Sequence, residues 1–170
     1  DFANQHLWDK NTFVQSQYKK EFNRKWAFQA SAKWNWSYQR YLNPDYASSA
    51  GKEDNSYYQQ EYYLSASALY RVLDNLSFSL STDGSINTLN ANLTDFAYPT
   101  RYSWLTALAG KYVNEWLTLS ASALATVTNE KVQQGTKADN HRRLTPYVSA
   151  SFKPFRSEEF RIRFFYKDIF

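Results

Sequence analysis

The sequence predicts an all-β fold: an antiparallel up-and-down meander of about eight long strands that forms part of a transmembrane β-barrel. From Lys25 to Leu42, aromatic or small apolar residues alternate with polar ones, and this period is typical of an extended strand with two different faces. Soluble strands usually have roughly 5–6 residues, whereas a tilted membrane strand needs about 9–11. The aromatic residues of this stretch cluster near its two ends, as in the girdles of outer-membrane barrels.

Composition narrows the class of protein further. Aromatic residues make up 19% of the 170 residues, and Tyr and Trp suit an interface that is apolar on one side and wet on the other. The mean hydropathy of −0.69 is compatible with a membrane barrel, in which only alternate residues need be apolar. No stretch approaches the roughly 20 apolar residues of a membrane helix. The chain has no Cys, which excludes disulfides and thiolate sites. Its basic residues are scattered and its net charge is only +4, which argues against a nucleic-acid groove.

The same alternation recurs along the chain, which we interpret as one domain over residues 1–170. Aromatic residues again lie toward strand ends, small apolar residues lie between them, and polar residues occupy the other face. Pro146 interrupts one of these stretches and suggests a bulge or a sheet edge. The predicted strands are Thr12–Phe22, Lys25–Leu42, Tyr57–Val72, Leu76–Ser81, Arg101–Val113, Trp116–Val127, Arg143–Lys153 and Phe160–Phe170.

The connections between these strands differ in length in a regular way. Connections one, three, five and seven are predicted to be short, and Asn23-Arg24 is predicted to form a tight turn because Asn tolerates a positive φ. The second, fourth and sixth are long and polar, over residues 43–56, 83–99 and 128–142. Short turns at one end and long loops at the other are typical of bacterial outer-membrane barrels.

The alternation also predicts which side chains share a face. One face is expected to contact lipid and the other to line a lumen. The predicted lipid-facing girdle consists of Trp26, Phe28, Trp34, Trp36, Tyr58, Tyr62, Tyr70 and Trp104. The predicted lumen-facing residues are Gln29, Lys33, Asn35, Glu61, Arg71 and Lys111.

No motif in the sequence predicts catalysis, a cofactor or a metal site. His6 and His141 are far apart and lack a partner at a metal-ligand spacing. The adjacent carboxylates Glu53-Asp54 and Glu158-Glu159 fall in predicted connections, where such pairs are usually solvated. We therefore expect a protein that is not an enzyme.

A soluble barrel is the alternative that the alternation leaves open. In a lipocalin-like carrier of eight strands, the apolar side chains would form the core and the polar face would point outward. Strand length and the end-clustered aromatic residues favour the membrane barrel. The period of two alone does not determine which face is inside.

Three stretches resemble the barrel of TonB-dependent outer-membrane receptors, especially those of Bacteroidetes: residues 22–26, 57–77 and 161–170. The resemblance implies a receptor in a Gram-negative outer membrane that imports iron chelates, cobalamin or similar nutrients with energy from TonB. It implies a 22-stranded barrel around a plug, of which this chain would be a middle slice without plug or TonB box. The expected partners are outer-membrane lipid, the remaining barrel and plug, TonB and a small-molecule ligand, but no nucleic acid.

A complete eight-stranded outer-membrane protein is a further alternative. Phe170, with Tyr166, Phe164 and Ile162 before it, would suit the last strand of such a barrel. If a ligand contacts this chain, we expect the long loops to make the contact.

Overall fold

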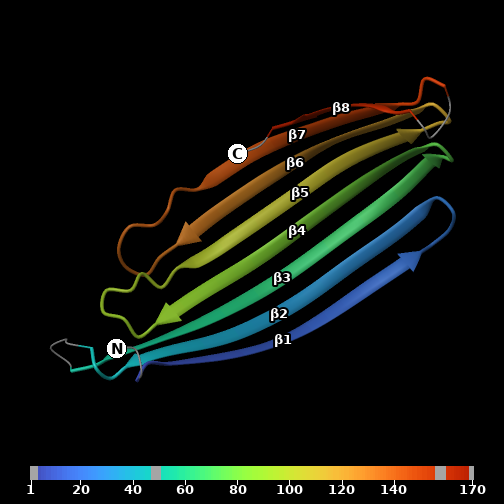
Figure 1. The fold of residues 1–170 in the computed structure, drawn as a ribbon. Helices are drawn as coiled ribbons and strands as arrows, with labels where there is room; N and C mark the ends of the chain where they lie inside the picture. The colour runs from blue at the N-terminus through green and yellow to red at the C-terminus, as the bar shows by residue number, and fades with distance from the viewer. Residues whose placement is uncertain (1–3, 47–50, 156–159, 169–170) are drawn as a thin grey trace.

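The computed structural model describes residues 4–46, 51–155 and 160–168. Within these residues, the chain forms one antiparallel sheet in which eight strands follow one another in sequence order (Figure 1). The predicted all-β meander is therefore confirmed. Within that part of the chain there is no helix whose length and apolar character would let it cross a membrane. The strands are β1 His6–Glu21, β2 Trp26–Asn43, β3 Glu53–Leu73, β4 Leu76–Ala91, β5 Thr100–Val113, β6 Leu117–Lys131, β7 His141–Phe152 and β8 Ile162–Lys167.

Several strands are longer than predicted at the end that carries the long connections. β1 begins at His6 rather than Thr12, β3 begins at Glu53 rather than Tyr57, and β6 ends at Lys131. The largest error concerns β4, which continues to Ala91 through the predicted loop from Asp83. Asp, Asn and Gly disfavour strands, but pairing with both β3 and β5 overrides that local preference.

The connections alternate between the two ends of the sheet. The three that were predicted to be long are shorter than predicted, and one that was predicted to be short is long. Residues 22–25, 74–75 and 114–116 form short turns at one end, and residues 44–52, 92–99 and 132–140 connect strands at the other (Figure 1). The seventh connection, residues 153–161, was predicted to be short and is instead as long as 132–140. β8 begins only at Ile162, where its pairing with Phe152 of β7 begins.

Two of the short turns are closed by an Asn side chain. Asn23 Oδ1 accepts hydrogen bonds from the backbone N–H groups of Lys25 and Trp26, at 2.8 and 2.9 Å. Asn114 Oδ1 accepts from Trp116 and Leu117 in the same way, at 3.1 and 2.7 Å. Among the described non-glycine residues, only Asp95 and Tyr98 have a positive φ, so the predicted role of positive φ at Asn23 is wrong.

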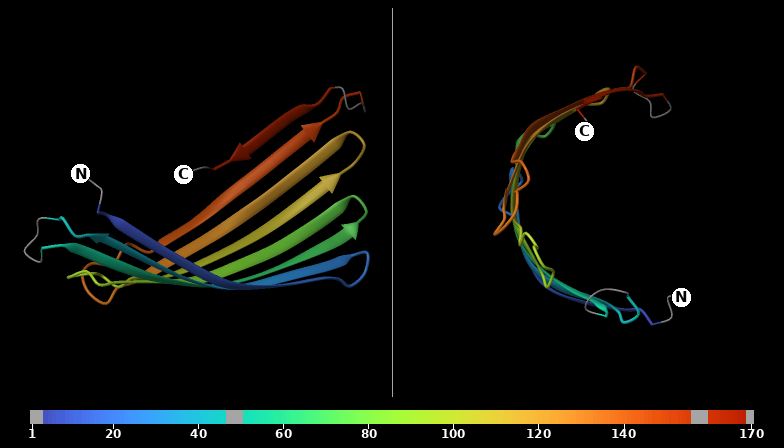
Figure 2. Two further views of the ribbon diagram at one scale, coloured as in Figure 1. Left: turned by 60° about the horizontal axis from the view of Figure 1, so that its bottom comes forward. Right: turned by 90° about the vertical axis from the view of Figure 1, so that its left-hand side faces the viewer.

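The sheet bends into an arc that is open on one side (Figure 2). β1 and β8 are its two edges, and neighbouring strands pair in sequence order from one edge to the other. Pro146 causes no bulge, because the register of β6 against β7 passes through the Ala123–Pro146 pair without a shift. Its position agrees with the predicted edge, since β8 pairs with β7 only from Tyr147 onward.

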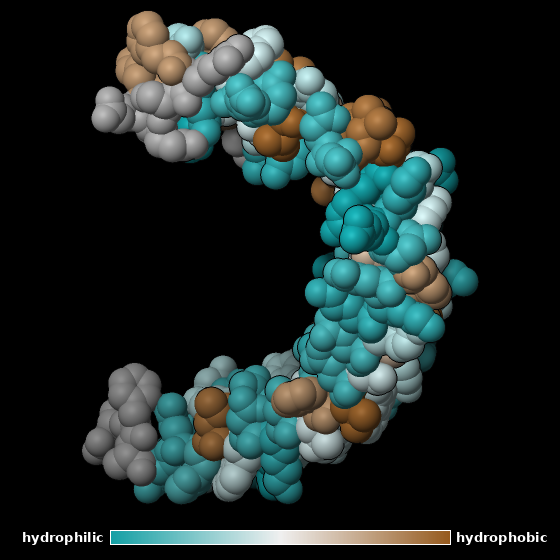
Figure 3. All heavy atoms as spheres, turned by 90° about the vertical axis from the view of Figure 1, so that its right-hand side faces the viewer, coloured by the Kyte–Doolittle hydropathy of each residue, from teal (hydrophilic) through white to brown (hydrophobic). Residues whose placement is uncertain are grey.

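The two faces of the arc differ in polarity, and neither encloses a hydrophobic core. Hydrophilic residues cover most of the concave side in Figure 3, while hydrophobic residues lie toward the convex side. Among the described apolar residues only Ala91 is buried. Large convex side chains stay exposed instead, including Leu80 (52%), Trp104 (57%), Leu108 (57%) and Leu144 (63%).

Candidate functional site

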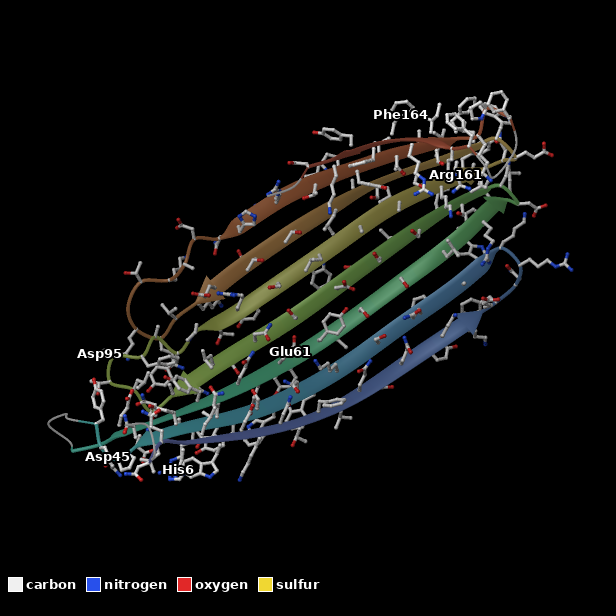
Figure 4. All side chains as sticks on the ribbon, in the orientation of Figure 1. His6, Asp45, Glu61, Asp95, Arg161 and Phe164 are labelled. Carbon is white, nitrogen blue, oxygen red and sulfur yellow. The ribbon has the colours of Figure 1, made fainter. Side chains whose placement is uncertain are left out.

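The six residues predicted to face a lumen share one face of the sheet, the concave face on which Glu61 is labelled in Figure 4. The register places them together, because directly opposed residues in a sheet share a face. Gln29, Lys33 and Asn35 of β2 oppose Ser67, Tyr63 and Glu61 of β3. Arg71 opposes Ser77 of β4, which in turn opposes Lys111 of β5.

The concave face carries an ion pair near its middle. Lys33 Nζ lies 3.2 Å from Glu61 Oε2, and both side chains are partly exposed. Glu61 is labelled in Figure 4, where it lies midway along β3. Arg71 instead lies at the short-turn end and donates a hydrogen bond to the Arg24 carbonyl at 3.2 Å. The six predicted residues thus extend along the whole face rather than forming one cluster.

A second ion pair lies on the concave face at the end with the long connections. Arg101 of β5 donates from Nε and Nη2 to Glu130 Oε2 of β6, at 3.2 and 2.9 Å. Glu130 Oε1 also accepts from the backbone N–H of Ala138 at 3.4 Å. These hydrogen bonds, that of Arg101 foremost, hold the pKa of Glu130 below its usual value. The pair therefore fixes the connection 132–140 against the sheet.

Two adjoining hollows on the concave face lie beside this ion pair, and the sequence did not predict most of their residues. The first, of about 390 Å³, contains Asp9, Asn11, Gln39, Tyr57 and Gln59. The second, of about 370 Å³, adds Asn87, Arg101 and Glu130 and shares Gln59 and Leu89 with the first. Asp9, Asn11 and Asn87 were missed because they lay in segments predicted to be outside strands. Gln39 and Gln59 could have been predicted, because they stand at odd-numbered positions of the same strands as Asn35 and Glu61 and therefore share their face.

The long connections are tied to the sheet and to one another by hydrogen bonds. Asn92 bridges to β3, because its Oδ1 accepts from Ser56 N–H at 2.7 Å and its Nδ2 donates to the Asp54 carbonyl at 2.8 Å. The backbone N–H of Gln133 donates to the Ala97 carbonyl at 2.9 Å. Two of the three connections therefore form one structured rim above the hollows.

The eight residues predicted as a lipid-facing girdle all lie on the convex face. Their rings contact each other across strands: Trp26 stacks on Tyr70 with ring centroids 4.3 Å apart. Tyr58 contacts Tyr38 of β2 at 4.8 Å. At mid-strand the small residues Ala30 and Ala66 oppose each other between these aromatic groups. The remaining predicted girdle residues are Phe28, Trp34, Trp36, Tyr62 and Trp104, on β2, β3 and β5.

Two of the convex aromatic rings cover glycines on the neighbouring strand. Trp104 opposes Gly84, and Phe78 opposes Gly110. A Cβ atom added at either glycine would lie 3.1 Å from the opposing ring. The missing side chains thus let β4 and β5 carry large rings close to the backbone.

The described residues offer no group of three His, Cys, Asp or Glu side chains that could hold a metal ion. His6, labelled at the long-connection end in Figure 4, stacks on Trp8 with centroids 5.6 Å apart. His141 begins β7, which is far from β1 in the strand order. The carboxylates Glu53 and Asp54 belong to β3, and Asp54 forms an ion pair with Arg40 at 2.7 Å. Glu158 and Glu159 lie outside the described residues.

No protein-family model and no curated protein matches this sequence. The fold and the distribution of side chains define a curved antiparallel sheet with a polar concave side and an apolar convex side.

Proposed function

We propose that this chain forms part of the wall of a β-barrel in a bacterial outer membrane, and that the barrel takes up a nutrient. The convex face would contact lipid, the concave face would line the lumen, and the long connections would face outside. The observation that carries this proposal is the separation of side chains between the two faces of a sheet that has no core. The nutrient class, an iron chelate, cobalamin or a similar compound, follows from the resemblance to TonB-dependent receptors.

The apolar side chains of the convex face favour contact with lipid. Large exposed apolar patches on soluble proteins are normally covered by a partner, and this one extends from β1 to β8. Three of its polar side chains near mid-strand hydrogen-bond to one another, which suits hydrocarbon. Trp104 Nε1 donates to Thr106 Oγ1 at 3.1 Å, and Thr106 Oγ1 lies 3.1 Å from Thr82 Oγ1.

The curvature favours a larger barrel over a complete eight-stranded one. Barrel diameter grows with the number of strands, so eight strands that close upon themselves must curve tightly. Here the same eight strands make an open arc, with β1 and β8 on opposite sides of the opening (Figure 2). The sequence's resemblance to a receptor barrel agrees with this wider curvature.

The polarity of the arc weighs against a soluble lipocalin-like carrier. Such a carrier needs apolar side chains on its inner face. The concave face instead carries the Lys33–Glu61 and Arg101–Glu130 ion pairs and rows of Ser residues. A soluble carrier would need the sheet to curve the other way, so that its apolar face lined the ligand site.

Single-cysteine labelling tests the membrane assignment. Ala66 and Ser67 are neighbours on opposite faces of β3, and Ala123 and Ser122 are a second such pair on β6. In outer membranes that contain the full-length gene product, Ala66→Cys and Ala123→Cys should react only with a lipid-soluble maleimide. Ser67→Cys and Ser122→Cys should react with a water-soluble one. Labelling of all four by the water-soluble reagent would exclude the lipid-facing convex side.

Loop replacement tests the uptake proposal. Residues 44–52, 92–99 and 132–140 would be replaced by two-residue turns in the full-length product. Uptake of a ferric siderophore or of cobalamin, in cells without another importer, should fall while the protein remains in the membrane. Unchanged uptake of the transported compound would show that the long connections are not its contact. Failure of the wild type to take up either compound would contradict this nutrient class and leave the membrane assignment intact.

A further inference from the structure

The convex face contains an apolar groove that is lined by residues of β3, β4, β5 and β6. Its volume is about 520 Å³, a size typical of small-molecule sites. Its walls are the rings of Tyr62, Tyr102 and Trp104 with the side chain of Leu64, and Gly84 forms part of its floor. Because Gly84 has no side chain, the Trp104 ring lies close over the backbone of β4 and forms one wall of the groove.

The groove is suited to a chain of hydrocarbon rather than to a polar compound. Its aromatic walls are well exposed, with Tyr62 at 49% and Trp104 at 57%. The Trp104 N–H is already bonded to Thr106, and the Tyr62 hydroxyl donates to Gln60 Oε1 at 3.1 Å. The polar atoms of the Tyr62 and Trp104 side chains are therefore occupied, and most of the surface that the groove offers to a ligand is carbon.

Two cations lie beside the groove on the side of the long connections. Lys131, the last residue of β6, places Nζ 5.6 Å from the centroid of the Tyr102 ring. Arg142 of β7 directly opposes Val127, which lines the groove, and its side chain is exposed. Both belong to the convex face. An anion bound between these two cations would therefore lie next to the apolar groove.

We infer that the groove holds one acyl chain of a membrane lipid with a net negative, phosphate-bearing head group, and that Lys131 and Arg142 contact the phosphate. This inference rests on the proposed function, because it requires the convex face to lie in a bilayer. Basic residues at a membrane surface attract anionic lipids, and each contributes on the order of fivefold to the local enrichment. Two cations beside an aromatic groove would therefore select anionic over zwitterionic lipid.

Quenching of Trp104 fluorescence by lipids with brominated acyl chains tests the inference. The full-length product would be reconstituted in vesicles of phosphatidylcholine and phosphatidylglycerol, with the bromine on one lipid or on the other at the same mole fraction. Subtracting the signal of the Trp104→Phe variant isolates the emission of Trp104. We expect several-fold stronger quenching by brominated phosphatidylglycerol, and loss of that preference in Lys131→Gln/Arg142→Gln.

The matched control is Lys10→Gln/Lys20→Gln, which removes the same charge from the convex face of β1, away from the groove. It should keep the preference for phosphatidylglycerol. Loss of the preference in both double variants would indicate general charge attraction and overturn the site. Equal quenching of wild-type Trp104 by both lipids would also overturn it, yet leave the membrane assignment standing. The absence of Trp104 quenching by either lipid would contradict the proposed function itself.

Discussion

At the scale of single residues, the turn asparagines show how one side chain can replace an unusual backbone conformation. Asn23 and Asn114 each accept two backbone N–H groups, so the turns close without a positive φ at either residue. Local bonds of this kind are the reason that Asn is favoured in turns.

Removing these side chains should weaken the hairpins. We expect Asn23→Ala and Asn114→Ala each to lower the free energy of unfolding by about 1 kcal/mol, because two turn N–H groups lose their acceptor. Asn43→Ala is the matched control, since among the described residues Asn43 Oδ1 accepts a single N–H, that of Asp45, at 3.2 Å. Urea unfolding in detergent measures all three. A loss for Asn43→Ala as large as for Asn23→Ala would contradict the explanation.

The Arg101–Glu130 pair makes the rim sensitive to acid. Arg101 lowers the pKa of Glu130 in the folded protein. The stabilising effect of this ion pair is therefore complete above the ordinary Glu pKa of 4.5 and is lost as the pH falls below that value. Hydrogen exchange at the Ala138 amide, corrected for its intrinsic rate, should therefore become several-fold less protected in that range.

Glu130→Gln should reduce this protection at neutral pH and remove its pH dependence. Glu21→Gln, at the opposite end of the sheet, should leave the Ala138 amide unchanged. Equal behaviour of wild type and Glu130→Gln at every pH would show that the rim does not depend on this carboxylate.

At the scale of elements, the sequence determines strand interiors better than strand ends. Alternation is strict where one face is apolar, so β2 was predicted to within one residue at each end. Toward the long connections both faces become polar, and the signal vanishes even though the hydrogen-bonded ladder continues. The segment from Asp83 to Ala91 was misjudged for this reason.

The same limit applies to the candidate site. The odd or even position of a residue along its strand, which we call its parity, predicted which face Lys33, Glu61 and Trp104 occupy. It could not predict that Gln59 lies between two hollows, because that depends on the register of β1 and β4 with their neighbours. Parity predicts the face of a residue, and register predicts its neighbours.

A charge placed on either face of one strand should distinguish the faces energetically. Ala123 and Ser122 are half-buried neighbours near the middle of β6, on the convex and concave sides. In lipid, Ala123→Arg should lower the free energy of unfolding by roughly 2–4 kcal/mol, the cost of Arg at the midplane of a bilayer. Ser122→Arg should change it far less. Similar values for both variants, measured by denaturant unfolding from vesicles, would refute a lipid-facing convex side.

At the scale of the whole molecule, the two edges of the sheet matter most. β1 and β8 each pair on one side only within the described residues, and exposed strand edges tend to pair with other chains. In a lipid bilayer an unpaired edge is costlier, because hydrocarbon offers no hydrogen bonds. If the sheet lies in a bilayer as proposed, both edges need a hydrogen-bonded partner. A larger barrel would supply further strands, whereas a small closed barrel would pair β1 with β8.

Crosslinking between the edges separates these two assemblies. Val14 and Trp34 oppose each other across β1 and β2, so Val14→Cys/Trp34→Cys should be joined by a short bifunctional reagent. Val14→Cys/Phe164→Cys places one Cys on the convex face of β1 and one on that of β8. These two should not be linked within one chain, because the strands lie on opposite sides of the opening (Figure 2). Mass spectrometry of the protein from outer membranes reads out both links. Efficient intramolecular linkage of Val14→Cys/Phe164→Cys would mean that the eight strands close on themselves, and the wider barrel would have to be abandoned.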